Sequence, residues 1–286
     1  MIRLAFIFIF FTTAALAAGS ALSEQVNAYF REKKWPEAQA LLEQAVTAEP
    51  ANAEAHFLLG LSFLNRNDAE HALPSLEKAV TLAPTNSNYV RHLGDAYGMT
   101  AQKAGLFAKM GWAKKCKAAY DKAVELDPKD INARWSVMEF CRQAPGFLGG
   151  GMDGAYAQAA EIKKIDRVRG LGAYNLLYVA EKKYNEAFAL YEEMLKDSPE
   201  DYGTLLQVGR LAGVSGERLD QGLAALQHCL TLTPPPGHPD HSRVHWRIGT
   251  ILEKKGDKPG ARAAYEAALA LDPKFPQAVE SLAKLH

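Results

Sequence analysis

Five stretches of the chain share one spacing of apolar and polar positions. In each, apolar residues recur as on one face of a helix, and the stretch ends at a proline. A small residue stands twelve positions before that proline: Ala38, Ala72, Cys116, Ala187 and Ala261. A large residue follows four positions later: Leu42, Leu76, Tyr120, Tyr191 and Tyr265. The pattern predicts five amphipathic helices of one type, each stopped by a proline, which cannot continue a helix.

A second kind of helix is predicted upstream of most of these stretches, and it carries a glycine among large apolar residues. The glycines are Gly60 in LLGLSF, Gly94 in LGDAY, Gly209 in VGRLA and Gly249 in IGTIL. Two antiparallel helices approach closely only where glycine or alanine removes side-chain bulk, and large residues then fill the spaces beside them. The sequence therefore predicts antiparallel helix pairs held together by this alternation of small and large residues.

The prolines that close these helix pairs recur at intervals close to a fixed length. The intervals are 34 residues from Pro50 to Pro84, then 44 to Pro128, 71 to Pro199, 35 to Pro234 and 39 to Pro273. The third pair is thus lengthened by ten residues. The interval of 71 residues holds two pairs, the first of which has Arg167 in place of its proline. This pattern resembles the tetratricopeptide repeat, a helix–turn–helix unit of 34 residues.

The resemblance implies an all-α fold, a right-handed superhelical solenoid of about seven antiparallel helix pairs. We expect one tetratricopeptide-repeat domain over residues 22–286, with a final helix at 276–286 that caps the last exposed helix pair. The lengthened third repeat, followed by the turn APGFLGG at 144–150, resembles a subgroup of exported bacterial tetratricopeptide proteins that carry an APG..GG turn. The subgroup implies a fold and a compartment but no enzymatic activity.

A glycine motif of the dinucleotide-binding type lies within this turn. Gly149, Gly151 and Gly154 spell G-x-G-x-x-G. That motif binds a pyrophosphate only between a strand and a helix, and here the preceding INARWSVMEFCRQ has a helical period. We therefore interpret the glycines as a bend between two helices of the fourth repeat and expect no bound nucleotide or other cofactor.

The N-terminal residues differ from the rest of the chain. Arg3 precedes an apolar run from Leu4 to Leu16, and small residues follow at Ala15 and Ala17. This order predicts a cleavable signal peptide over residues 1–21 and hence a periplasmic or secreted protein. An uncleaved anchor is the alternative, although the run is shorter than the ~20 residues that span a bilayer.

The charge balance and the cysteine content argue against several classes of function. The 33 basic and 33 acidic residues balance, which gives no bulk attraction to nucleic acid. Cys116, Cys141 and Cys229 are odd in number and cannot all pair within the chain. They occupy small-residue packing positions, where a buried thiol is expected. The sequence shows no base beside them and no other catalytic set, so we expect a protein that is not an enzyme.

Two other clusters offer alternative functions. His238, Asp240, His241 and His245 lie close together, and the last two histidines are one helical turn apart, a spacing that could ligate zinc. A solvated turn and helix start, with Asp240 or Ser242 as N-cap, is the favoured interpretation. The segment 99–117 holds five lysines, no acidic residue, and Leu106, Phe107, Met110 and Trp112. It could lie on an anionic membrane, but a hairpin with solvated lysines is favoured.

The tetratricopeptide resemblance also places a binding groove on the first helix of each pair, where known members bind peptides or partner helices. Carrying the groove positions of the family over to this chain gives Phe57, Leu61, Arg91, Asp95, Trp135, Glu139, Arg142, Leu206, Arg210, Arg243 and Trp246. Tryptophan and arginine are common at the energetic centres of interfaces. The predicted function is therefore a non-enzymatic scaffold that binds a peptide or partner protein in this groove.

Overall fold

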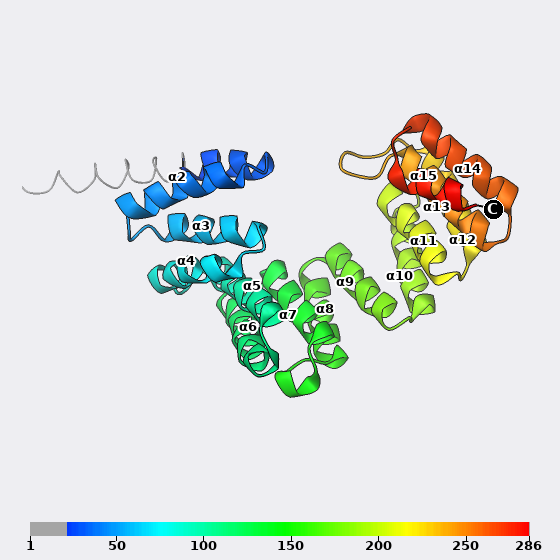
Figure 1. The fold of residues 1–286 in the computed structure, drawn as a ribbon. Coiled ribbons are helices and arrows are strands. Elements are labelled where there is room, and N and C mark those ends of the chain that lie inside the picture. Colours follow the sequence, from blue (N-terminus) through cyan, green and yellow to red (C-terminus); the bar gives the residue numbers. More distant parts are fainter. Residues whose placement is uncertain (1–21, 286) are drawn as a thin grey trace, which may run out of the picture. The chain divides into compact units, whose positions relative to one another are not determined.

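The structure, a computed structural model, describes residues 22–285, all of whose regular structure is helical. The signal peptide predicted over 1–21 lies outside this range. The first helix covers residues 22–31. In chain order, the following helices are α2 (Trp35–Ala48), α3 (Ala53–Asn65), α4 (Ala69–Leu82), α5 (Ser87–Lys103), α6 (Leu106–Leu126), α7 (Ile131–Gln143), the short 3-10 helix η1 (Gly146–Leu148), α8 (Met152–Ile165), α9 (Arg167–Ala180), α10 (Tyr184–Asp197), α11 (Tyr202–Ser215), α12 (Leu219–Thr231), α13 (His241–Lys254), α14 (Lys258–Leu271) and α15 (Pro276–Lys284) (Figure 1).

These helices follow one another as pairs. The closest neighbours in the structure are α3 with α4, α5 with α6, α7 with α8, α11 with α12 and α13 with α14. Counted in chain order from residues 22–31, the helices make seven pairs followed by α15. The predicted all-α solenoid class, with about seven helix pairs, is confirmed.

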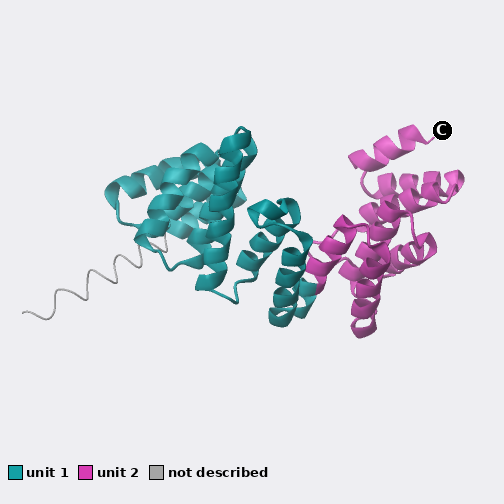
Figure 2. Ribbon diagram, turned by 90° about the horizontal axis from the view of Figure 1, so that it is seen from below, with its two compact units in different colours: residues 1–170 teal, residues 171–286 magenta. Residues whose placement is uncertain are grey.

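The chain divides into two compact units, residues 1–170 and residues 171–286 (Figure 2). We call them unit 1 and unit 2 and describe each by itself. In unit 1, α3 contacts α5 and α5 contacts α7, and in unit 2, α11 contacts α13. The first helices of successive pairs therefore lie side by side. We call the surface they form the first-helix face of each unit.

The predicted alternation of small and large residues is what lets the paired helices approach. A Cβ atom added at Gly94 would lie 2.6 Å from the ring of Tyr120, and one at Gly249 would lie 2.4 Å from the ring of Tyr265. The same holds at Gly60 under Leu76. Non-bonded carbon atoms prefer separations of about 3.5–4.0 Å. Glycine in the first helix is thus required by the large residue of the second.

Two helix pairs pack together without a glycine in the first helix. In the fourth pair the sizes are reversed, because Met138 stands at the glycine position of α7 and Ala159 at the large position of α8, and both side chains are fully buried. In the fifth pair, Asn175 replaces the glycine, and the hydroxyl of Tyr191 donates a hydrogen bond to Asn175 Oδ1 at 2.8 Å. These are the irregular repeats in which the sequence pattern is weakest.

Acidic and amide side chains set where many of the helices begin. The side chain of the residue before the helix accepts a hydrogen bond from a backbone N–H of the first turn in α3, α4, α5, α7, α11, α13 and α14, through Asn52, Asp68, Asn86, Asp130, Asp201, Asp240 and Asp257. Such a cap satisfies a backbone N–H that has no partner within the helix. Each cap fixes the residue at which its helix begins.

The ten additional residues of the third repeat extend its two helices. α5 has 17 residues and α6 has 21, against 13 and 14 in the preceding pair α3–α4. The extension ends in a short turn, with Ala104 as the C-cap of α5 and Gly105 as the N-cap of α6. The result is a helical hairpin that is longer than the neighbouring pair.

The glycine-rich segment forms a bend between two helices, as its flanking pattern predicts. Gly149 and Gly151 adopt φ angles of 80° and 120°, which other residues rarely adopt. The backbone also passes very close to Ala144, because a Cβ at Gly150 would lie 1.8 Å from that carbonyl oxygen. The Gly151 N–H donates to the carbonyl of Cys141 at 2.7 Å. Since α7 and not a strand precedes the bend, the motif has no nucleotide-binding context.

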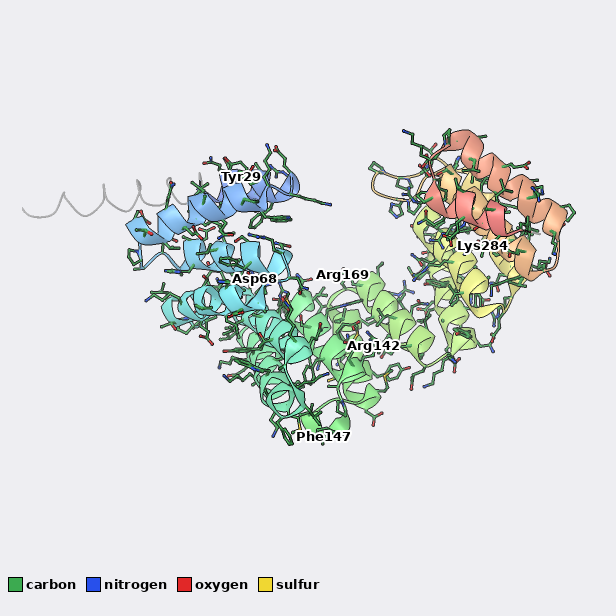
Figure 3. All side chains as sticks on the ribbon, viewed as in Figure 1. Tyr29, Asp68, Arg142, Phe147, Arg169 and Lys284 are labelled. Atoms are coloured by element: carbon green, nitrogen blue, oxygen red, sulfur yellow. The ribbon has the colours of Figure 1, made fainter. Side chains whose placement is uncertain are left out.

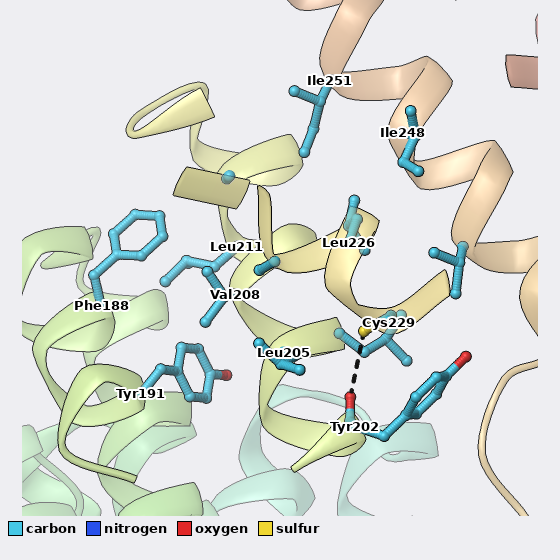
Figure 4. Packing of buried hydrophobic residues seen from close by; sticks show 14 of the residues in the cluster. Phe188, Tyr191, Tyr202, Leu205, Val208, Leu211, Leu226, Cys229, Ile248 and Ile251 are labelled. Atoms are coloured by element: carbon cyan, nitrogen blue, oxygen red, sulfur yellow. Dashed lines mark hydrogen bonds between the residues drawn. The ribbon is translucent and has the colours of Figure 1, made fainter. Parts of the chain in front are cut away.

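Each unit has its own apolar interior. In unit 2, buried side chains of α10, α11, α12 and α13 meet in one cluster that includes Phe188, Leu226 and Ile251 (Figure 4). Cys229 is fully buried there, with its thiol 3.7 Å from the carbonyl oxygen of Tyr202. Burial on this scale, at roughly 25 cal/mol per Å² of apolar surface, is the main stabilising contribution.

Candidate partner-binding site

The charged groove residues of α5 gather around one carboxylate in unit 1, although the buried Nε of Arg91 has no hydrogen-bond partner. Arg91 and Asp95 are an ion pair at 3.4 Å, and His92 Nδ1 lies 2.9 Å from the same carboxylate. The second oxygen of Asp95 accepts a hydrogen bond from the Tyr120 hydroxyl at 2.7 Å. A further guanidinium N–H of Arg91 donates to Asn88 Oδ1 at 3.1 Å. Asp95 is therefore engaged on both oxygens by groups of its own unit.

Two apolar groove residues of α3 lie beside this network. Phe57 is only 7% exposed and stacks on Tyr89 with ring centroids 4.4 Å apart. Its ring also lies 5.3 Å from that of His92. Leu61, one turn further along α3, is half-buried and packs against the same cluster. Phe57 therefore joins α3 to α5 within the core, and Leu61 is the more accessible of the two residues.

The groove residues of α7 form a third group in unit 1. Glu139 and Arg142 are an ion pair at 2.7 Å, and Gln143 donates a hydrogen bond to the same carboxylate at 2.9 Å. Trp135 is half-buried on the same helix, one turn before Glu139. The charges of α7 are thus also paired with each other, as those of α5 are.

In unit 2, the groove residues of α11 and α13 differ in exposure. Leu206 is 4% exposed and belongs to the core, so it packs the helices and offers no surface to a partner. Trp246 is half-buried: its indole N–H donates to Ser281 at 3.1 Å, and its ring meets Phe275 edge-to-face. Trp246 therefore anchors the segment around α15. Arg210 and Arg243 remain exposed on the surface.

A third arginine joins these two, and the groove positions did not include it. Arg247 lies one helical turn after Arg243 on α13, and its guanidinium stacks on the ring of Trp246 at 5.6 Å. The guanidinium of Arg243 lies 5.5 Å from the ring of Phe275. We call Arg210, Arg243 and Arg247 the arginine cluster. The i, i+4 spacing of Arg243 and Arg247 was the signal in the sequence that could have revealed it.

Two of the three positive charges of the arginine cluster have no carboxylate partner among the described residues of unit 2. Within residues 22–285, neither Arg210 nor Arg247 forms an ion pair with a carboxylate, and Asp240 is 3.9 Å from Arg243. The buried Nε of Arg247 has no hydrogen-bond partner. Burial first, and then the charges of Arg210 and Arg243, lower the pKa of the Arg247 guanidinium. Buried unpaired charge is costly unless a ligand satisfies it.

The histidine segment is arranged as a helix start. Asp240 accepts hydrogen bonds from the Arg243 N–H and the Ser242 hydroxyl, which makes it the N-cap of α13. His241 Nε2 lies 2.9 Å from the carbonyl oxygen of Leu232. His238 contacts the ring of Tyr202 edge-on. In the part of the chain that the structure describes, no three His, Cys, Asp or Glu side chains are grouped so that they could hold a metal ion.

The thiols are placed for packing. All three cysteines are buried and free. Burial raises the pKa of Cys116 to about 12 and that of Cys229 to about 11, and it also raises the pKa of Cys141. A thiol must ionise to act as a nucleophile, so these pKa values oppose that chemistry at neutral pH. Their role as buried small side chains agrees with their positions in the repeats.

No helix among residues 22–285 is long and apolar enough to cross a bilayer. The tetratricopeptide repeat family matches the chain at three places, residues 23–87, 101–130 and 242–275. These matches fall on helix pairs in both units. Together with the stacked helix pairs, they support a tetratricopeptide repeat protein.

Solved structures show the same fold. A tetratricopeptide repeat protein from Parabacteroides merdae has 16% identity and a TM-score of 0.59, with 94% of this chain and 98% of that chain covered. Yeast Tom70 has 16% identity and a TM-score of 0.59 over 88% of this chain and 51% of its own. Pseudomonas aeruginosa PilF has 17% identity and a TM-score of 0.51 over 81% and 97%. At these identities the likeness concerns the fold alone. A search of curated proteins found no match.

Proposed function

We propose that this chain is a non-enzymatic scaffold that binds an acidic segment of a partner protein on the first-helix face of unit 2. The tetratricopeptide fold supports a role in protein–protein interaction. The observation that carries the acidic specificity is the arginine cluster, in which neither Arg210 nor Arg247 has a carboxylate partner among residues 22–285. Arginine recognises carboxylates through paired hydrogen bonds from its planar guanidinium.

The aromatic neighbours give the cluster a fixed geometry before a partner binds. Trp246 supports the guanidinium of Arg247, and Phe275 lies next to that of Arg243. Rigid donors lose less conformational entropy on binding, which increases affinity. Glutamate or aspartate side chains of the partner would complete the hydrogen bonds that unit 2 leaves open. In this proposal, Arg210, Arg243 and Arg247 make the energetically central contacts.

Selection of peptides from a random display library on the full chain tests this function. We expect Asp and Glu to be enriched among the selected peptides. Fluorescence anisotropy with one selected peptide should show about 30-fold weaker binding to an Arg210→Gln/Arg247→Met variant, since a charged hydrogen bond contributes about 1.5–3 kcal/mol.

The matched control removes two exposed lysines, Lys129→Gln and Lys254→Gln, which lie outside the arginine cluster. This control should bind the selected peptide as the wild type does. Selected peptides without acidic residues, or equal binding by the arginine variant, would contradict the proposal. An equal loss in the lysine control would show a bulk charge effect instead of a site.

We further propose that the scaffold works in the cell envelope of a bacterium, as a periplasmic or secreted protein. The order of charged, apolar and small residues in the first 21 positions supports this compartment. The intact mass of the protein recovered from a periplasmic extract tests it. A mass equal to that of the full chain in the cytoplasmic fraction would contradict export.

A further inference from the structure

The lengthened hairpin of unit 1 presents apolar side chains at its tip. Leu106 is 73% exposed and Phe107 is 85% exposed, both in the first turn of α6, and Met110 is exposed one turn later. Residues of this type are normally buried in a folded protein. Their position at the end of an extension, away from the core of α3–α6, means that the hairpin's own packing does not require them.

A second exposed segment lies beside α6, near Lys117. Phe147 is 74% exposed and belongs to η1, which packs against α6. A Cβ placed on Gly149 would lie 3.9 Å from Cε of Lys117, so the bend that carries η1 runs along α6. Figure 3 shows Phe147 projecting at the edge of unit 1 next to α6. We call Leu106, Phe107, Met110 and Phe147 the tip surface.

The charge next to Leu106, Phe107 and Met110 has one sign. No Asp or Glu occurs between Ala96 and Tyr120, and the bend 144–150 has no charged residue. Lys109 and Lys114 are exposed, and among the described residues no carboxylate is paired with either. The tip surface therefore combines projecting apolar groups with free positive charge, a combination that fits an anionic and apolar partner.

Contacts with the preceding repeat fix the hairpin as far as its turn. Tyr97 of α5 and Trp112 of α6 stack with ring centroids 5.7 Å apart, and the ammonium group of Lys115 lies 4.5 Å above the ring of Trp112. The hydroxyl of Tyr97 donates to Glu77 of α4 at 3.1 Å. Lys103 donates to the carbonyl oxygen of Asn67. The hairpin is thus fixed to the preceding repeat, and the tip surface is held in one orientation relative to α4.

We propose that the tip surface docks the protein on an anionic lipid bilayer, with Phe107 and Phe147 in the headgroup–acyl boundary and Lys109 and Lys114 at the lipid phosphates. A side chain that is 85% exposed projects from the protein and can enter a lipid interface. Exposed apolar groups mark contacts with proteins or with membranes, and lysines beside projecting apolar side chains favour the membrane interface. Apolar insertion and charge attraction together give interfacial binding that neither provides alone.

Co-sedimentation of the full chain with vesicles tests this proposal. The vesicles contain about 30% phosphatidylglycerol in phosphatidylcholine, because the lysines require anionic lipid. We expect a Phe107→Ser/Phe147→Ser variant to bind about tenfold more weakly, from the loss of inserted apolar surface. A Lys109→Glu/Lys114→Glu variant should lose binding at about 0.1 M salt, and the wild type should bind less at about 0.5 M salt.

Matched variants isolate the tip surface from the rest of the chain. The apolar run Leu4–Leu16 is present in every protein compared, so a difference between variants reports the tip alone. Val214→Ser/Leu271→Ser removes two exposed apolar residues of unit 2, and Lys129→Glu/Lys254→Glu reverses two lysines elsewhere. Both controls should bind vesicles as the wild type does. Circular dichroism of each variant shows that it is folded.

Three results would overturn the proposal. Equal vesicle binding by the wild type and the Phe107→Ser/Phe147→Ser variant would remove the tip surface from lipid binding. Equal losses in the Val214→Ser/Leu271→Ser control would indicate a nonspecific apolar effect. Self-association of the wild type in sedimentation velocity, lost in the phenylalanine variant and without vesicle binding, would assign the tip surface to a second copy of this chain.

Discussion

The first-helix faces of the two units both carry arginines, but only one face pairs its arginine with an acidic residue. In unit 1, Arg91 is held by Asp95, with Tyr120 and His92 on the same carboxylate. In unit 2, Arg247 has no carboxylate partner among residues 22–285, and its charged neighbours are Arg210 and Arg243. The buried Nε atoms of Arg91 and Arg247 both lack a hydrogen-bond partner. The repeat geometry is shared, so the difference lies in the side chains that the geometry carries.

This difference separates two uses of a charged residue. In unit 1 the charge of Arg91 is paired with Asp95, and Tyr120 joins the same carboxylate to α6, so the network contributes to stability. In unit 2 the charges of Arg210 and Arg247 have no carboxylate partner among residues 22–285, which costs stability in the free protein and becomes favourable when a ligand supplies acceptors. A charge that is paired within its own unit therefore fits a structural role, and a charge without a carboxylate fits a binding role.

Substituting the packing glycines tests whether the two units share one geometry, and it has the largest expected effect. Gly94→Ala in unit 1 and Gly249→Ala in unit 2 each place a Cβ within 2.6 Å of a tyrosine ring. Overpacking of this kind costs about 1–3 kcal/mol, and we expect about 2–3 kcal/mol in each unit. Urea unfolding, followed by hydrogen exchange of α5 and of α13, measures both changes.

The control is Gly111→Ala, where a Cβ would meet nothing within 4 Å. Because alanine favours helix over glycine by about 1 kcal/mol, this variant should be slightly more stable than the wild type. If Gly94→Ala destabilised unit 1 and Gly249→Ala left unit 2 unchanged, the two units would not be packed alike. A difference between their charged residues could then reflect a difference in helix packing.

Replacing one arginine of each unit by methionine should change the stabilities of the two units in opposite directions. Arg91→Met leaves Asp95 without the guanidinium that pairs with it, so we expect unit 1 to lose about 1–2 kcal/mol. Arg247→Met removes a half-buried charge that has no carboxylate partner among the described residues, so we expect unit 2 to gain about 1 kcal/mol. The local free energies of opening from hydrogen exchange over α5 and α13 measure the two signs.

Asp121→Ala serves as a reference for an ordinary surface ion pair. Asp121 pairs with Lys117 and has a half-exposed side chain, so its removal should change stability by about 0.5 kcal/mol or less. A loss of stability in Arg247→Met as large as that in Arg91→Met would mean that the arginine cluster is structural. The proposed binding site would then lose the observation that carries it.

Much of the fold could be predicted because the packing rule is local. Gly94 and Tyr120, or Gly249 and Tyr265, occupy fixed positions in one repeat, and the shape of a helix pair determines which residues meet. The bend at Gly149–Gly151 was equally readable from the helical period before it. The reversed sizes at Met138 and Ala159 were not, because the repeat pattern offers no rule for exchanging the two positions.

The candidate sites were less predictable because they depend on side-chain partners. The groove positions identified Arg210 and Arg243, but they also included Leu206, which the core buries. They omitted Arg247, whose importance comes from the absence of a carboxylate partner in the part of unit 2 that the structure describes. Likewise, the lysine-rich segment was visible in the sequence, whereas the contribution of Phe147 depends on η1 packing against α6.

One histidine in each unit should make the stability of that unit depend on pH. This is the smallest effect that we expect. Burial first, and then the charge of His241, lower the pKa of His245 in unit 2 below its usual value of about 6.5. Unfolded His245 therefore takes up a proton before the folded form does, and unit 2 should lose stability as pH falls below about 6.5. A hydrogen bond to Asp68 raises the pKa of His71 in unit 1. The stabilisation from this pair is fully present below about pH 6.5 and is lost as the pH rises through the pKa of His71 in the folded protein.

The two substitutions His245→Gln and His71→Gln separate these contributions. Between pH 8 and pH 5, His245→Gln should reduce the loss of stability of unit 2, by less than about 1 kcal/mol. His71→Gln should remove a small gain in unit 1 over the same range, because the exposed pair with Asp68 is screened by solvent. Hydrogen exchange over α13 and α4 at several pH values measures both slopes. If the stability of both units changed with pH in the same direction, the two causes would be wrong. Burial of His245 and the pairing of His71 with Asp68 predict opposite directions.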